Sequence, residues 1–434
     1  MALMSAPRPI RAISRADLTL AIVNGVIGSA IFGMPAQIAA LTGARSPIAH
    51  AIAALGVLTI VLCFAEVASR FEDRGGAYLY AREAFGRHVG FQAGWLTLWT
   101  RLLSAAANLN VFASYLSQIL PVAAEGAGRS AVIVFVLFVI TLINLIGVKQ
   151  ASWAVDVFTI AKLLPLALLV LLGLPSVSAE VLSTQTVAQP QWTQAVLLLI
   201  FAFGGFEAPL MSAGEAKDAR KDSPYALLVA LGIIAAVYIS VQYVTIGLVP
   251  NLQQEKAPIA AAFSVLWGPV GVTFASFAAM ISVWGWATGN GLQSPRLLFS
   301  MAERGELPAA FARVHPRFLT PHVSIIGFSI VAGALAIQGT FEWNAILSAI
   351  VRLIVYTLVC ISFWVFRRTK GPAQFQVPLA APVSLLALGF CFYMLSTRSF
   401  AQAGIIFAAM LVGHVLMLVQ KAPPSGANPT SPTA

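Results

Sequence analysis

Residues 24–35 of the chain read NGVIGSAIFGMP. They lie inside an apolar run, residues 17–40, that is long enough to cross a bilayer as a helix, which takes about 20 residues. Three glycines and a proline in this stretch interrupt the helix, because glycine has a low helix propensity and proline removes a backbone hydrogen bond. Unwound backbone at membrane depth is tolerated only around a cavity or a ligand. The sequence therefore predicts a broken first span beside a buried site.

A second interruption lies in the sixth apolar run, where residues 201–209 read FAFGGFEAP. Close packing of helices accounts equally well for one such stretch, since small residues let backbones approach. Two similar interruptions, in the first and sixth spans, favour a transporter built from inverted repeats. The N-terminus of a half-helix attracts a carboxylate, and free carbonyls attract an ammonium. A zwitterionic amino acid presents both groups, so the two breaks predict a site for the constant part of an amino acid.

The composition indicates a membrane protein. The chain has 434 residues, of which 59% are hydrophobic and 10% charged, whereas soluble domains contain about a quarter charged residues. Apolar runs long enough to span a bilayer occur twelve times, although hydropathy alone also permits eleven or thirteen spans. The runs are 17–40, 47–70, 88–120, 130–147, 153–173, 191–214, 223–248, 263–303, 322–339, 343–366, 377–395 and 398–420.

The distribution of basic residues predicts the orientation. With twelve spans, 18 of the 26 lysines and arginines fall in loops on the side of the termini, and four fall on the opposite side. Cytoplasmic loops carry the excess of Lys and Arg, so we expect both termini in the cytoplasm, with an N-terminal tail at 1–16 and a disordered tail at 421–434. The same sorting explains the net charge of +10 without any nucleic-acid partner. No metal site, cofactor or catalytic residue is expected.

Four segments together resemble the amino acid–polyamine–organocation (APC) superfamily of permeases. Residues 28–35 resemble its first-helix motif, and residues 203–207 resemble its sixth-helix break. Residues 214–224 and 296–308 resemble two of its cytoplasmic segments. The resemblance covers roughly residues 15–370, in order and at the corresponding spans.

The resemblance implies an all-α membrane protein of about 12 transmembrane helices with the LeuT-like 5+5 inverted repeat. The first five-helix repeat would occupy residues 17–173 and the second residues 191–366, with two additional helices at 377–420. The implied activity is secondary active transport of amino acids by alternating access, in the cytoplasmic (plasma) membrane. Coupling would be independent of sodium, as proton symport or as exchange.

The resemblance also implies the substrate-binding residues. The carboxylate would meet the N–H groups and hydroxyl around residues 28–30, and the ammonium would meet carbonyls at the two breaks. Phe201 would be an aromatic gate over the substrate. Ala30 departs from the family's more usual glycine, and glycines at both 204 and 205 suggest room for a bulky substrate side chain. The full set is Val26, Ile27, Gly28, Ser29, Ala30, Phe201, Ala202, Phe203, Gly204 and Gly205.

Ionisable residues inside membrane spans indicate function, because charge is costly there. Lys162 is about ten residues from either end of its span, or about 15 Å, which is far for its side chain to reach water. A structural ion pair with Asp156 is the alternative, although a spacing of six residues faces poorly on a helix. The resemblance implies that the Lys162 ammonium replaces sodium and ties the fifth helix to the first, with the eighth as a further candidate. Because a buried lysine releases its proton more readily, we also expect Lys162 to couple transport to protons.

Three more charged residues lie deep in spans. Glu207 follows the second break, either as a gate or as a carboxylate that caps freed N–H groups. Arg101 and Arg352 lie within the third and tenth spans, and one of them is expected to pair with Glu207. The other arginine would contact backbone carbonyls or an acidic part of the substrate. In the eighth span, Trp284 and Trp286 are candidates for lining a cavity.

Other functions remain open at this point. The transporter could instead exchange or export amines, polyamines or other amino-acid derivatives. An ion channel usually repeats one filter in symmetric subunits, and no such repeat is visible. A membrane enzyme would need a cluster of catalytic histidines and carboxylates, and the histidine pattern does not provide one. The substrate side chain and the oligomeric state are not determined.

Overall fold

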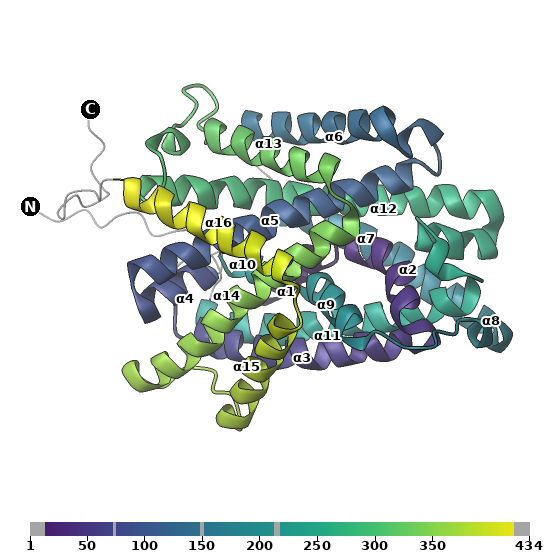
Figure 1. Cartoon of the computed structure of the whole chain (residues 1–434), viewed down its shortest axis with the longest axis horizontal. Helices are drawn as coiled ribbons and strands as arrows, with labels where there is room; N and C mark the ends of the chain where they lie inside the picture. The colour runs from purple at the N-terminus through teal and green to yellow at the C-terminus, as the bar shows by residue number, and fades with distance from the viewer. Residues whose placement is uncertain (1–13, 73–74, 148–151, 212–217, 421–434) are drawn as a thin grey trace, which may run out of the picture.

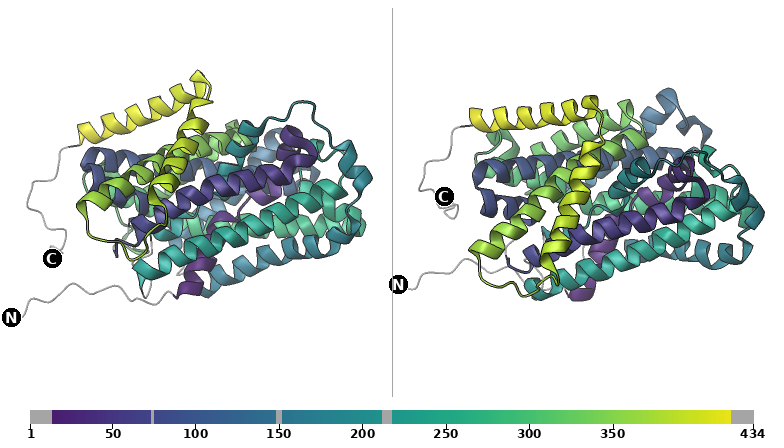
Figure 2. Two further views of the ribbon diagram at one scale, coloured as in Figure 1. Left: turned by 90° about the horizontal axis from the view of Figure 1, so that it is seen from below. Right: turned by 60° about the horizontal axis from the view of Figure 1, so that its bottom comes forward.

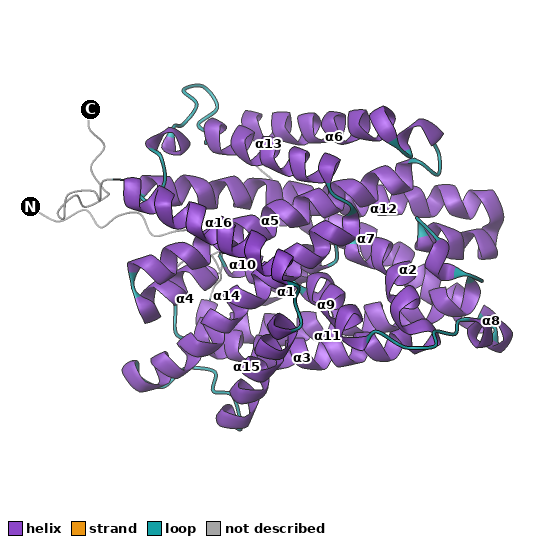
Figure 3. Cartoon of the chain, in the orientation of Figure 1, coloured by secondary structure: helices purple, strands orange, loops and turns teal. Residues whose placement is uncertain are grey.

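The computed structural model describes residues 14–72, 75–147, 152–211 and 218–420, with the side chains of 152–156 and 288–292 left aside. Throughout these residues the regular elements are helices (Figure 3). Both predicted tails lie largely or wholly outside the described residues, as does the Asp156 side chain. The first four residues of the cytoplasmic segment 214–224 lie outside them as well.

A helix, or a pair of helices, occupies each of the twelve apolar runs. The first five runs contain α1 (Arg15–Val26) with α2 (Ala30–Thr42), α3 (Ser46–Ala68), α5 (Arg87–Leu116), α6 (Gly126–Ile146) and α7 (Ser152–Gly173). The other runs contain α9 (Trp192–Phe203) with α10 (Glu207–Leu210), α11 (Ala219–Leu248), α12 (Pro258–Glu303), α13 (His322–Gln338), α14 (Phe341–Thr369), α15 (Ala380–Ser396) and α16 (Phe400–Val419). The short helices α4 (Gly76–Phe85) and α8 (Ala179–Thr184) lie in the connections.

Length and apolar composition identify a multi-span membrane protein. Within the described part of the chain, seven helical stretches are long and apolar enough to cross a bilayer, with α2 and α3 counted as one, and α9, α13 and α15 are shorter apolar helices. The number of these long apolar stretches is below the twelve predicted spans partly because the broken first and sixth spans are each divided into short helices. Helix α5 carries Arg101, Asn108 and Asn110, which make it more polar, and all three are buried.

The helices form a bundle with α5 near its centre (Figure 1). Helix α5 contacts α12, α13 and α14, while α1 packs against α7 and α11. The outer helices expose large apolar side chains, such as Phe135 and Phe138 on α6 and Phe407 on α16. A large exposed apolar surface of this kind is expected to face lipid rather than water.

The last two helices lie on the outside of the bundle. Helix α15 packs against α3 and α14, and α16 packs against α5. Figure 2 shows α1 beginning and α16 ending toward the same end of the bundle. The start of α1 is set by Ser14 and Asp17, whose side chains accept hydrogen bonds from each other's backbone N–H groups. An ion pair of 2.8 Å then joins Arg15 to Asp222 on α11.

Candidate functional site

The first break lies where the glycine-rich stretch predicts it. Helix α1 ends at Val26 and α2 begins at Ala30, so residues 27–29 are not helical. Side chains from other helices bond the freed backbone groups. The Ser29 N–H donates to Asn108 Oδ1 on α5 at 3.1 Å. A substrate carboxylate at this N–H would therefore have to displace the Asn108 side chain.

The second break is held against the first by glycine. Helix α9 ends at Phe203 and α10 begins at Glu207. Gly205 has φ +115°, a backbone conformation that favours glycine, and a Cβ on it would lie 2.7 Å from the Gly25 carbonyl oxygen. The two interruptions predicted from sequence thus meet in space. Close backbone packing and unwinding are both present, so these two explanations of the glycines are not exclusive.

The space beside Gly204 corrects one expectation. A Cβ on Gly204 would overlap the Arg352 guanidinium, so this glycine makes room for an arginine of α14. The sequence suggested that the two glycines leave room for a bulky substrate side chain. That interpretation is wrong in this conformation, because Arg352 and the Gly25 backbone occupy the space.

Glu207 pairs with Arg352 and also caps the second break. Arg352 Nη1 lies 3.4 Å from Glu207 Oε1. The other carboxylate oxygen accepts hydrogen bonds from the Tyr356 hydroxyl at 2.9 Å and from the Gly205 N–H at 3.0 Å. The expected ion pair with an arginine and the expected cap for freed N–H groups are therefore combined in one side chain, whereas the alternative role of Glu207 as a gate stays a prediction.

Lys162 reaches the first break from α7. Its side chain is fully buried, and Nζ donates to the Ile27 carbonyl at 2.7 Å and to the Asn24 carbonyl at 3.2 Å. This is the connection between the fifth span and the first that the resemblance implies. Both of these acceptors are neutral main-chain groups exposed by the end of α1.

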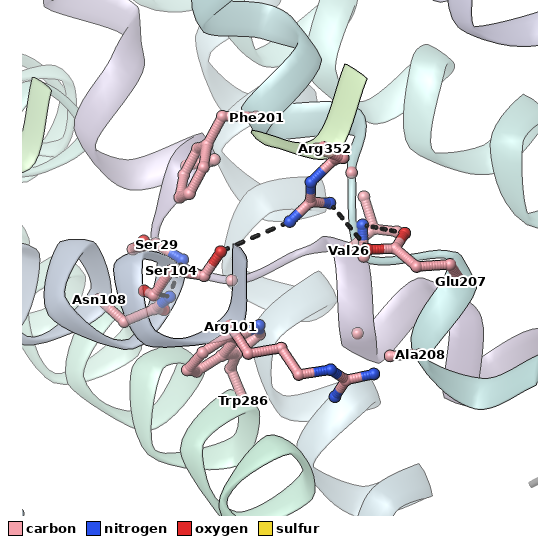
Figure 4. Close-up of a pocket in the computed structure, with 15 residues that line it drawn as sticks. Val26, Ser29, Arg101, Ser104, Asn108, Phe201, Glu207, Ala208, Trp286 and Arg352 are labelled. Carbon is pink, nitrogen blue, oxygen red and sulfur yellow. Dashed lines mark hydrogen bonds and ion pairs between the residues drawn. The ribbon is translucent and has the colours of Figure 1, made fainter. Parts of the chain in front are cut away.

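The breaks surround a small cavity, shown in Figure 4. Its volume is about 30 Å³. That is enough for one or two water molecules and well below the ~300 Å³ at which ligand pockets usually begin. The site is contracted in this conformation. The lining residues are Gly25, Val26, Gly28, Ser29, Ala30, Arg101, Ser104, Asn108, Phe201, Gly204, Gly205, Glu207, Ala208, Trp286 and Arg352.

Most of the candidate residues meet at this cavity, but four do not line it. Lys162 and Ile27 lie behind it, joined by the hydrogen bond at the first break. The Ala202 carbonyl accepts a hydrogen bond from the Tyr238 hydroxyl at 3.1 Å, and Phe203 packs against the same tyrosine ring. These residues support the breaks rather than face the cavity. Phe201 does line it, and its ring packs edge-on against Phe341.

Two polar side chains that line the cavity, those of Ser104 and Asn108, were missed by the sequence interpretation. Both lie on α5, three and seven residues after Arg101, and this spacing puts all three side chains on one face of a helix. A polar stripe at positions 101, 104 and 108 of an apolar run was the signal that could have found them. Of the two tryptophan candidates in the eighth span, Trp286 lines the cavity from α12 and Trp284 does not.

A helical membrane protein whose two broken spans meet at a buried polar cavity belongs to the class of membrane transporters. A family model described as amino acid permease matches residues 13–418, and the chain belongs to this family. The predicted membership of the APC superfamily is thereby confirmed.

Three relatives from Bacillus subtilis (strain 168) match most of the chain. The serine/threonine exchanger SteT is 27% identical over 91% of this chain and 92% of its own. A methylthioribose transporter is 28% identical over 89% of this chain and 88% of its own. The branched-chain amino acid permease BcaP is 25% identical over 92% of this chain and 90% of its own.

Proposed function

We propose that the protein carries amino acids across the cytoplasmic membrane by alternating access, with the cavity between the two breaks as the substrate site. The observation that carries the proposal is the contact of the two unwound segments beside a buried polar cavity. Unwound backbone supplies N–H groups for a carboxylate and carbonyls for an ammonium. The names of two relatives, the serine/threonine exchanger SteT and the branched-chain amino acid permease BcaP, describe the transport of amino acids. The third relative is named a methylthioribose transporter.

The proposed roles follow the geometry. The substrate backbone binds between residues 26–30 and 201–205, and Phe201 closes over it. Since the cavity is contracted, binding must be accompanied by movement of side chains, and Asn108 and Arg352 are the groups that fill the space. Glu207 is paired with Arg352 and therefore moves with it. Because Glu207 also caps the second break, the movement involves that break as well.

The proposed topology has two five-helix repeats, residues 17–173 and 191–366, followed by two helices and with both termini in the cytoplasm. The correspondence of the first and sixth runs as broken spans supports the repeat. The surplus of basic residues on the side of the termini supports the orientation.

Lys162 supports the proposal that transport is independent of sodium. Its ammonium already supplies a positive charge to the Asn24 and Ile27 carbonyls at the end of α1. A sodium ion bound to the same carbonyls would meet like charge in a low-dielectric interior. The driving force would then be a proton gradient or the exchange of one amino acid for another.

The test is uptake into proteoliposomes from a panel of labelled amino acids, with amines and polyamines alongside. Uptake is measured with and without a proton gradient, with and without internal amino acid, and with sodium replaced by potassium. We expect amino acid uptake that survives the removal of sodium. Uptake that requires sodium would contradict the role given to Lys162, and single-channel currents would contradict a carrier.

A further inference from the structure

A second cavity lies beside the first, between α5, α6, α12 and α13. Its volume is also about 30 Å³. Most of its wall is apolar and includes Ala105 and Leu109 on α5, Leu137 and Ile140 on α6, and Phe328 on α13. None of the described residues that line this second cavity is charged. The first cavity, in contrast, is lined by two arginines and a glutamate.

Two side chains separate the cavities. Asn108 and Trp286 line both of them, so these residues form the wall between the two spaces. Both also pack against the first break, because a Cβ on Gly28 would lie 3.2 Å from Asn108 Oδ1 and 3.0 Å from Trp286 Cδ1. In Figure 4 they lie on the side of the first cavity away from Glu207. The wall thus consists of side chains, which can rotate, beside the backbone that is proposed to bind the substrate.

The opposite side of the first cavity offers less room. There the main chain of Gly205 packs against the main chain of Gly25. The guanidinium of Arg352 fills the space beside Gly204. This arginine is ion-paired with Glu207, so its movement would separate two buried charges, which is costly. A substrate side chain is therefore accommodated more easily toward Asn108 and Trp286.

Binding of the substrate carboxylate would also open this wall. Asn108 Oδ1 accepts the Ser29 N–H at 3.1 Å, and Asn108 Nδ2 donates to the Ser104 carbonyl at 2.8 Å. A carboxylate that takes the Ser29 N–H displaces Asn108 Oδ1, and the same movement joins the two cavities. In an α-amino acid the side chain is attached to the carbon next to the carboxylate, so it begins at this opening.

We infer that the substrate is an amino acid with an uncharged, apolar side chain, aliphatic or aromatic, which enters the second cavity. This inference rests on the proposed function. A charged side chain would lose its hydration in the second cavity and meet no opposite charge among the described lining residues, which is unfavourable. An apolar side chain gains free energy by leaving water for this space. Leu137, Ile140 and Phe328 then determine the size of side chain that fits.

The experiment measures binding of labelled amino acids to the purified protein in detergent, so that it does not depend on transport. Leucine, asparagine and aspartate have side chains of similar size and shape but different polarity. We expect leucine to bind more tightly than either of the other two. Leucine has three more carbon atoms than alanine, so it should bind roughly 50-fold more tightly than alanine. Lysine and phenylalanine complete the panel.

Two variants then assign the side chain to the second cavity. Ala105 lines the second cavity but not the first, so Ala105→Val should weaken leucine binding about tenfold and leave alanine binding unchanged. Leu137→Ala enlarges the far wall and should shift the preference from leucine toward phenylalanine. The matched control is Ala408→Val, at an exposed alanine of α16, which should bind every ligand as the wild type does.

Three results would overturn the inference. Tighter binding of aspartate, asparagine or lysine than of leucine would refute it and leave the proposed function standing. Equal weakening of leucine and alanine in Ala105→Val, with an unchanged preference in Leu137→Ala, would place the substrate side chain elsewhere and also leave the proposed function standing. Absence of both binding and uptake for every amino acid in the panel would overturn the inference and the proposed function together.

Discussion

The contact between the two breaks makes Gly205→Ala the sharpest test of how the site is built. Gly205 has φ +115°, and a Cβ on it would lie 2.7 Å from the Gly25 carbonyl oxygen. The obstacle is main chain, which cannot rotate away as a side chain can. An alanine forced into this conformation costs about 1–3 kcal/mol in backbone strain, before any cost of moving the first break. We expect a lower melting temperature and loss of amino acid uptake.

The control for this prediction is Gly232→Ala in the middle of α11. A Cβ there would meet nothing within 4 Å, and helix propensity favours alanine over glycine by about 1 kcal/mol. The control should melt at or slightly above the wild-type temperature and transport normally. Melting is followed in detergent by intrinsic fluorescence, and uptake is followed in proteoliposomes. Wild-type melting and uptake in Gly205→Ala would refute the view that the two breaks are held in register by this contact.

Three further substitutions test the groups around the breaks. Lys162→Ala leaves two buried carbonyls without their donor, about 1–3 kcal/mol for each, so uptake should fall, and retention of full uptake with an unchanged pH profile would contradict its proposed role. Glu207→Gln keeps an acceptor for the freed N–H but removes the negative charge from the cavity, so uptake should fall more than thermal stability does. Arg367→Ala removes a partner of the fully buried Glu66 carboxylate and should cost about 3 kcal/mol in stability, whereas the exposed neighbour Arg368→Ala should cost almost nothing. Equal melting temperatures of the last two variants would argue against a structural role for the Glu66 ion pair.

The spans and the two breaks could be predicted from the sequence because they depend on local properties. An apolar run of about 20 residues can be buried only in lipid or in a protein core, and glycine and proline interrupt a helix wherever they occur. The importance of Lys162 could also be predicted from the sequence, because a lysine in the middle of a span must find polar partners. Its acceptors, the carbonyls of Asn24 and Ile27, lie far from it in the sequence, so they could not be deduced from α7 alone.

Other features were misread or missed because they depend on which helices are neighbours. Glycine at position 204 looks the same in sequence whether the freed space holds a substrate or a side chain. In the structure it holds the guanidinium of Arg352, which comes from a helix some 150 residues later. The hydrogen bond from the Ser29 N–H to Asn108 was not anticipated for the same reason.

The sequence by itself determined a multi-span helical membrane protein with two interrupted helices and charged residues at membrane depth. Only the tertiary structure decided that the interruptions touch at Gly25 and Gly205, that Glu207 pairs with Arg352, and that both arginines line one cavity. The physical reason is the range of the forces. Hydropathy and helix propensity act within a few residues of the chain, whereas ion pairing and close packing act between helices whose order in space the local pattern does not encode.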